Sequence, residues 1–256
     1  MKIASFNVNS IRVRLKILLD WLEKESPHIV CLQETKVPDH AFPKKEIEKK
    51  GYRIVFRGEK TFNGVAVLSK DDFQQVSYGF DDGSEGPRLI FSKTKGIHVI
   101  NSYVPQGLHA FSEKFREKLD WLQRLYYHVK ETYKPTMPVL WTGDFNIAPE
   151  QRDVYDPQLL KGRVGFHPDE HAVLGRFKEW GFRDVFRLHN SEAGQYTFWE
   201  YTVKDVVKKN LGWRIDHIWA TPVLAEKSAR SWIDKTPRLL KKPSDHTPII
   251  AEFDIS

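Results

Sequence analysis

Apolar runs and amphipathic stretches alternate along the first part of this chain and predict strands and a helix. Lys2 to Phe6 reads as a strand. The next stretch, Ile11 to Leu22, carries isoleucine or leucine every three or four residues, which is typical of a helix with one buried face. Ser10 stands where its side chain would cap that helix. A second apolar run, His28 to Leu32, follows Pro27, so the chain opens with strand, helix and strand.

A Lys-rich helical segment near Lys44 to Lys50 is followed by short runs of β-branched and aromatic residues. Turn residues such as Asn63-Gly64 separate these runs, which favours hairpin connections. The pattern predicts an antiparallel meander over Tyr52 to Phe56, Gly64 to Leu68, Phe73 to Tyr78, Arg88 to Phe91 and Ile97 to Val104.

A buried strand that begins at Val139 stops abruptly at Thr142-Gly143. Two polar residues, Asp144 and Asn146, follow at once. Because side chains alternate along an extended chain, we expect these two to face the same way while Phe145 faces the core. The alternative is that Asp144 only caps a turn, as most Gly-Asp pairs do.

The second half of the chain repeats the order of the first. A helix is predicted over Ser112 to Tyr133, residues 150–168 read as a loop, and His167 with His171 marks the start of the next helix. The remaining elements are the helix Asp169 to Trp180 and the strands Trp213 to Trp219, Ser228 to Ile233 and Ile249 to Phe253. We therefore expect the α/β class, as a four-layer α/β sandwich of two mixed β-sheets packed face to face with helices outside, in a single domain over residues 1–256.

Composition narrows the choice of partner and compartment. Lys and Arg number 40 against 34 Asp and Glu, a moderate excess of positive charge that suits a polyanionic partner. The single cysteine, Cys31, lies in an apolar run, so we expect no disulfide framework, no cysteine-rich zinc site and a reducing compartment. Since no stretch approaches the roughly 20 apolar residues of a membrane span, we expect a soluble, cytoplasmic protein without membrane contact.

Polar side chains recur at the ends of the predicted strands, and this recurrence is the main sign of a functional site. Each residue alone is more often structural, but strand ends of packed sheets share one rim, where such groups can meet. The residues concerned are Asn7, Glu34, Tyr103, Asp144 with Asn146, Asp245 with His246, and Asp216.

Their chemistry favours a divalent cation and hydrolysis of a phosphodiester. Hard oxygen ligands such as Glu34, Asp144 and Asp245 suit Mg²⁺ or Mn²⁺ better than zinc or copper. His246 adds a base near neutral pH, and Asp216 could fix its tautomer. Such a set can activate water and stabilise charge on phosphate. A Ser-His-Asp hydrolase is the alternative on composition, but the Gly-x-Ser-x-Gly turn is missing from the sequence.

Eight short strings, taken in order from one end of the chain to the other, resemble the exonuclease III family of AP endonucleases. Singly they are weak signals, but together they span nearly the whole chain. They are Asn7-Val8-Asn9, Leu32-Gln33-Glu34-Thr35-Lys36, Asn63-Gly64-Val65-Ala66, Tyr103-Val104-Pro105, Gly143-Asp144-Phe145-Asn146, Tyr196-Thr197-Phe198-Trp199, Gly212-Trp213-Arg214-Ile215-Asp216 and Pro243-Ser244-Asp245-His246.

The resemblance implies Mg²⁺-dependent cleavage of double-stranded DNA 5′ to an abasic site, often with 3′ to 5′ exonuclease and 3′-end cleaning activity. It implies that Glu34 is the principal metal ligand and that Asp144 orients or deprotonates the attacking water. It further implies that Asp216 and His246 face the scissile phosphate and that Tyr103 supports the phosphate or the leaving group. The remaining residues implied at or near the ion are Asn7, Asn146 and Asp245.

Two positions depart from the pattern of the family. Gln106 follows Tyr103-Val104-Pro105 where many relatives carry Asn, so a contact to the DNA backbone differs in reach. Asn9 stands where some relatives place Asp, which removes one possible ligand charge. Both departures bear on metal affinity and substrate range more than on the class of reaction.

The residues that match the family's pocket for an extruded abasic sugar are Phe198, Trp213 and Ile215. An apolar, aromatic wall can admit a sugar without a base and exclude a normal nucleotide. The alternative is that all three belong to the core, which is where most Phe and Ile are found. The lysine pairs Lys44-Lys45, Lys208-Lys209 and Lys241-Lys242 either contact phosphates or are simply solvated.

Two other functions stay open at this point. The same fold could serve a phosphatase of lipids or inositol phosphates or a non-specific nuclease, and it could also serve as a binding module that has lost catalysis. The intact set Glu34, Asp144, Asp216 and His246 argues against the binding module. We expect a monomer. The catalytic interpretation requires Glu34 and His246 to lie on the same side of the folded molecule.

Overall fold

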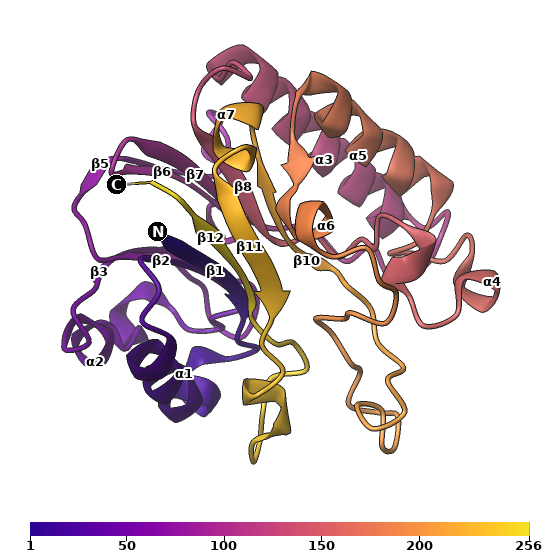
Figure 1. The fold of residues 1–256 in the computed structure, drawn as a ribbon, viewed down its shortest axis with the longest axis horizontal. Helices are drawn as coiled ribbons and strands as arrows, with labels where there is room; N and C mark the ends of the chain where they lie inside the picture. Colours follow the sequence, from indigo (N-terminus) through magenta and orange to yellow (C-terminus); the bar gives the residue numbers. More distant parts are fainter. Residues whose placement is uncertain (256) are drawn as a thin grey trace.

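Two six-stranded mixed sheets pack face to face in the computed structural model, which describes residues 1–255, and the expected four-layer α/β sandwich is confirmed (Figure 1). The first sheet, in the order β11-β12-β1-β2-β4-β3, consists of β1 (Lys2–Asn7), β2 (Ile29–Gln33), β3 (Arg53–Arg57), β4 (Val65–Ser69), β11 (Ser228–Ile233) and β12 (Ile249–Phe253). The second, in the order β5-β6-β7-β8-β10-β9, consists of β5 (Phe73–Tyr78), β6 (Leu89–Thr94), β7 (Ile97–Tyr103), β8 (Val139–Asp144), β9 (Arg183–Asp184) and β10 (Asp216–Ala220).

Helices cover the outer face of each sheet. The apolar face of α1 (Ile11–Glu25), with α2 (Lys44–Glu48), packs on one side of the first sheet. The longer α3 (Glu113–Thr132) and α5 (Pro168–Trp180) pack on the far side of the second sheet around Trp141. The shorter helices are α4 (Pro157–Leu160), α6 (Val185–His189) and α7 (Pro222–Ala225), with 3-10 turns at Asp39–Ala41, Gly86–Arg88, Gln151–Asp153 and Pro237–Leu239.

A third apolar layer fills the space between the sheets. Successive side chains on a strand point to opposite faces, so Ile3 enters this inner layer while Ala4 faces α1. Cys31 is buried in the same inner layer, in agreement with the absence of a disulfide framework. Every strand near the middle of either sheet is therefore covered on both faces.

Two parallel strand pairs bring distant polar residues to one rim. β1 and β2 are parallel, with Asn7 opposite Gln33, and α1 makes the crossover between them. β7 and β8 are also parallel, with Tyr103 opposite Asp144, and α3 makes that crossover. Parallel strands end at the same edge of their sheet. β10 runs antiparallel to β8 and begins there, with Asp216 opposite Asp144.

The expected single meander is wrong, because its strands divide between the two sheets. β3 and β4 pair with each other in the first sheet, whereas β5, β6 and β7 form an antiparallel set in the second. The turn residues between neighbouring runs predict hairpins, but they do not predict to which sheet each hairpin belongs. Residues 70–72 connect β4 in the first sheet to β5 in the second.

Three local expectations also differ from the structure. Ser10 precedes α1, but it adopts a φ of 83° instead of the extended conformation usual for an N-cap, and its side chain makes no capping hydrogen bond. The expected strand from Trp213 begins only at Asp216, because Trp213 pairs instead with Phe198 and Val154 through isolated bridges. The stretch 150–168 contains the short helix α4, and β9, α6 and α7 are further elements that the apolar pattern did not predict.

Among residues 1–255, we find no helix with the length and apolar character needed to cross a membrane.

Candidate active site

Two carboxylates, one from each sheet, meet across the amide of Asn7. The Asn7 Nδ2 atom donates to Glu34 Oε1 at 2.7 Å and to Asp144 Oδ2 at 2.9 Å. Glu34 directly follows β2 in a left-handed conformation, with φ of 51°. One ligand-capable atom from each of Glu34, Asp144 and His246 lies within 4.8 Å of the other two. The structure therefore brings Glu34 and His246 to the same rim, as the catalytic interpretation required.

Gly143 explains how Asp144 reaches this rim. Its φ is 138°, and a Cβ atom at this position would lie 1.9 Å from the backbone oxygen of Ser102 on β7. Only glycine allows the ends of β7 and β8 to approach so closely. This approach holds Tyr103 and Asp144 side by side at the strand ends.

Asp144 and Asn146 are neighbours in a turn rather than in the extended arrangement that alternation predicted. The strand ends at Asp144, and Asn146 adopts a φ of 52°. Asp144 Oδ1 accepts a hydrogen bond from the Asn146 backbone N–H at 2.8 Å, while the Asn146 amide donates to Val104 O at 2.9 Å. Phe145 is buried in the core as expected. Asp144 thus both caps a turn with one oxygen and faces the acidic cluster with the other.

His246 and Asp216 form a buried ion pair beside Asp144. The His246 Nδ1 atom lies 2.8 Å from Asp216 Oδ2, and Nε2 lies 3.8 Å from Asp144 Oδ2. Burial alone would lower the pKa of His246, but the negative charges of Asp216 and Asp144 outweigh it and raise that pKa to about 10. The imidazole is therefore protonated at neutral pH when no cation is bound.

The negative charge of the carboxylates in this cluster exceeds the positive charge of His246. Burial raises the pKa of Asp144, the carboxylates of Asp216 and Glu34 raise it further, and His246 opposes them. In the part of the chain that is described, the buried Asp216 Oδ1 atom has no hydrogen-bond partner. A divalent cation would reduce the repulsion between these carboxylates, and its bound water would donate a hydrogen bond to the unpaired Asp216 oxygen. The residues present therefore fit a hard cation.

The other residues predicted for the site lie around this cluster at different depths. Tyr103 ends β7, and burial, with the charges of Glu34 and Asp144, raises the pKa of its phenol well above the usual value. Gln106 is exposed and lines a cavity of about 750 Å³ with Arg88. Asp245 is not one of the three residues of the cluster. Its Oδ1 atom accepts hydrogen bonds from Asn9 and Ser244.

Lys36 is a site residue that the sequence interpretation did not assign. Its Nζ atom lies 2.6 Å from Glu34 Oε2 and 2.6 Å from Asn9 Oδ1. The ammonium group therefore links Glu34, through Asn9, to Asp245. Its position two residues after Glu34 could have indicated this role. The sequence alone, however, does not distinguish Lys36 from the other basic residues among the 40.

Phe198 and Trp213 line a cavity of about 680 Å³ next to the cluster. The ring of Phe198 lies 4.8 Å from that of His246, so the cavity adjoins the acidic rim. Ile215 does not line it. This residue is 6% exposed and packs with Phe166 and Leu160, which favours its interpretation as core.

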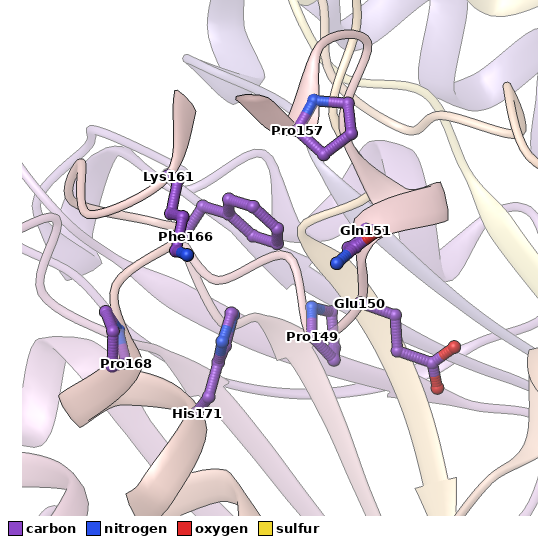
Figure 2. Close-up of a pocket in the computed structure, with 8 residues that line it drawn as sticks. All are labelled: Pro149, Glu150, Gln151, Pro157, Lys161, Phe166, Pro168 and His171. Atoms are coloured by element: carbon purple, nitrogen blue, oxygen red, sulfur yellow. The ribbon is translucent and has the colours of Figure 1, made fainter. Parts of the chain in front are cut away.

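A separate pocket lies on the other side of the segment that contains Leu160 and Lys161. Figure 2 shows its lining, in which the ring of Phe166 lies among three prolines with His171 and Lys161 nearby. His171 donates from Nε2 to the backbone oxygen of Ala148, and His167 is the N-cap of α5, so both histidines have structural roles. No predicted site residue lines this pocket.

The fold and this arrangement of acidic residues correspond to a known class of phosphoesterases. The sequence pattern of the Endonuclease/Exonuclease/phosphatase family matches residues 4–246. The chain belongs to this family. The expected resemblance is thereby confirmed at the level of the family.

Individual relatives match over the whole chain. The chain is 35% identical to exodeoxyribonuclease III of Haemophilus influenzae, covering 99% of this chain and 100% of that protein. A solved structure of an AP endonuclease from Archaeoglobus fulgidus is 45% identical, with a TM-score of 0.97 and complete coverage of both chains. A 3′ phosphatase from Neisseria, solved with a product DNA hairpin, is 33% identical, with a TM-score of 0.96 and complete coverage of both chains.

Proposed function

We propose that this protein is a Mg²⁺-dependent DNA repair nuclease that hydrolyses the phosphodiester bond 5′ to an abasic site in double-stranded DNA. We include 3′ to 5′ exonuclease and 3′-end cleaning activity in the proposal, and Mn²⁺ as a substitute metal. The names of the relatives support this class of activity. The single observation that carries it is the meeting of Glu34, Asp144 and His246 at one rim.

Glu34 and Asp144 would hold the cation, with Asn146 and Asp245 near it. When bound, Mg²⁺ would polarise the phosphate and lower the pKa of water. Asn7 donates its amide hydrogens to both carboxylates, so in this arrangement it keeps them at ligand spacing. Removing such an orienting partner commonly costs 10- to 100-fold in affinity or activity.

The other residues have complementary roles around the phosphate. Asp144 lies inside the cluster, with Oδ2 toward Asn7 and His246, and is placed to orient the attacking water or accept its proton. His246 is held by Asp216 through Nδ1, which leaves Nε2 as the nitrogen that would donate to a phosphate oxygen. Tyr103 stays neutral, because its pKa is raised, and its phenol is suited to donate to the phosphate or the leaving oxygen.

Incision of a duplex that carries one abasic site, in the presence of Mg²⁺, tests the proposal directly. We expect a nick 5′ to the abasic site, and a fall of roughly two orders of magnitude or more in Glu34→Gln, because the metal loses its central ligand. Glu46→Gln on the exposed face of α2 is the matched control and should keep full activity. No nick, with an inositol phosphate or a lipid consumed instead, would favour a phosphatase; no turnover of any substrate would favour a binding module.

The cavity beside Phe198 and Trp213 is the proposed site for the extruded abasic sugar. Trp213→Ala should widen this cavity and reduce the preference for abasic over intact duplex at least about tenfold, since an aromatic wall excludes a base-bearing nucleotide. Steady-state incision of the two duplexes measures the preference. Trp180→Ala, at the last residue of α5 and outside the lining of this cavity, is the control. Unchanged preference in Trp213→Ala would remove the pocket from the proposal.

The monomeric state and the cytoplasmic location stay predictions. Light scattering during size-exclusion chromatography tests the first, and fractionation of cells that express the chain tests the second.

A further inference from the structure

A fully buried ion pair lies behind the candidate site and has no part in the proposed reaction. Lys118 on α3 and Glu170 on α5 approach to 2.5 Å, and neither side chain is exposed to solvent. Removing two charges from water is costly, and apolar residues of similar volume often stabilise a core as well or better. The pair therefore needs a role other than general stability, and its remaining contacts indicate one.

The ammonium group of Lys118 holds the two segments that leave the catalytic strands. Its Nζ atom donates to the backbone oxygen of Asn146 at 2.8 Å and to that of Gln106 at 3.2 Å. Asn146 comes two residues after Asp144, and Gln106 comes three residues after Tyr103. With Glu170, these oxygens give the three donors of the ammonium one acceptor each.

The carboxylate of Glu170 holds a third segment beneath the pocket wall. Its Oε2 atom accepts hydrogen bonds from the backbone N–H groups of Gly165 at 2.8 Å and His167 at 3.0 Å. A Cβ atom on Gly165 would lie 3.2 Å from Cζ3 of Trp213 and 3.3 Å from the backbone oxygen of Asn146. Gly165 therefore lies between Trp213, in the wall of the pocket, and the turn that follows Asp144.

We propose that Lys118 and Glu170 are positioning residues that set the spacing between the turn at Asn146 and the Trp213 wall, and so determine selectivity for an abasic sugar over an intact nucleotide. The inference rests on the proposed function. Without the pair, the segments at Asn146 and Gly165 lose their common anchor, and the cavity can open to a larger group. The acidic cluster itself stays in place, because Asn7 holds Glu34 and Asp144 independently.

The double variant Lys118→Met/Glu170→Gln removes both charges and keeps the side-chain volumes close to their original values. We expect the ratio of kcat/KM for abasic over intact duplex to fall at least about tenfold, because a cavity that is no longer held at its original width discriminates less against a base-bearing nucleotide. Binding of Mn²⁺, followed by electron paramagnetic resonance, should stay within about twofold of the original protein, since Glu34 and Asp144 keep their hydrogen bonds to Asn7 in the variant. Lys50→Met/Glu23→Gln makes the same two substitutions in a solvent-exposed Lys-Glu pair near α1 and should change neither readout.

Equal losses on both duplexes, or an unchanged ratio, would overturn the inference and make the pair structural only. If the double variant does not fold, Glu170→Gln alone decides, because glutamine keeps an acceptor for the N–H groups while the charge is lost; the same fall in the ratio is then required. An original protein that cuts neither duplex overturns the proposed function together with this inference. Selective cutting by the original protein, with the same selectivity in the variants, overturns this inference alone.

Discussion

At the scale of single residues, the charge state of His246 depends on one neighbour more than on any other. Asp216 Oδ2 accepts its Nδ1 hydrogen at 2.8 Å, and its charge is the largest of those that raise the pKa of the imidazole. Asp216→Asn keeps the shape and removes that charge. We expect the pKa of His246 in the metal-free protein to fall by more than about one unit, equivalent to 1.4 kcal/mol of lost interaction with the charged form.

Nuclear magnetic resonance titration of the imidazole nitrogens measures this change. The sign follows from linkage: a raised pKa means that the pair stabilises the native state at pH values below the unfolded pKa of about 6.5 and that this contribution is lost as pH rises through the folded pKa. In Asp216→Asn the loss should begin at lower pH. His98, which faces Tyr133 away from the site, provides an internal control. A titration of His246 that matches the original protein would contradict the assignment.

Residue types predicted the site better than local geometry did. Glu34, Asp144 and His246 are far apart in the sequence, yet their position at strand ends was enough to predict that they meet. Asn146 and Ser10 were misjudged because each adopts a positive φ, 52° and 83°, and an apolar pattern contains no information about such a turn. Lys36 was missed because a cation can pair with an acid from almost any exposed position.

At the scale of elements, the packing of α5 on the second sheet depends on Phe177. This residue is fully buried, and its ring lies 4.2 Å from Trp141 on β8 and 5.4 Å from Tyr126 on α3. Phe177→Ala should lower the free energy of unfolding by about 3–5 kcal/mol, because it removes a large buried side chain and leaves a cavity.

Urea denaturation followed by circular dichroism measures that loss. Val13→Ala on the exposed face of α1 is the control and should change stability by less than about 0.5 kcal/mol. A loss below about 1 kcal/mol in Phe177→Ala would mean that the cluster collapses into the space or that α5 contributes little to the core.

Elements with strong periodicity were predicted well, and their assignment to sheets was not. α3 and α5 lie within a residue or two of the predicted ranges, because a long amphipathic pattern defines a helix on its own. β4 and β5 are consecutive strands in the sequence, yet they belong to different sheets. That division depends on which apolar faces meet in three dimensions. β9, with two residues, is too short to produce a pattern.

At the scale of the whole molecule, two long segments, one orange and one yellow, project from the same end of the molecule (Figure 1). Residues 200–211 and 235–242 line one cavity of about 650 Å³, and Tyr201 of the first donates to the backbone oxygen of Pro243 just past the second. Lys241 and Lys242 are exposed at the end of the second segment. If they contact DNA phosphates, each releases counterions on binding.

Lys241→Ser/Lys242→Ser should therefore reduce the slope of log affinity against log salt by roughly 1 for each phosphate contact removed. Fluorescence anisotropy with a labelled abasic duplex, without divalent metal, measures the slope. Lys130→Ser/Lys134→Ser, at the far end of α3 from Gln106, removes the same charge and should leave the slope unchanged. Equal slopes in both variants would assign Lys241 and Lys242 to the solvent.

We also propose that residues 1–256 act as one domain. The apolar layer between the sheets includes Ile3 near one end of the chain and Phe253 near the other, with contributions from both sheets. A single cooperative transition in calorimetry would support this proposal, and two separate transitions would contradict it.

Glu34 follows a strand of one sheet and Asp144 ends a strand of the other, so neither sheet alone carries a complete set of ligands. A chain still emerging from the ribosome, or one that has lost the contact between its sheets, cannot assemble the centre. For a proposed nuclease, this division means that the ability to cut DNA requires the complete fold. Loss of the contact between the two sheets removes that ability.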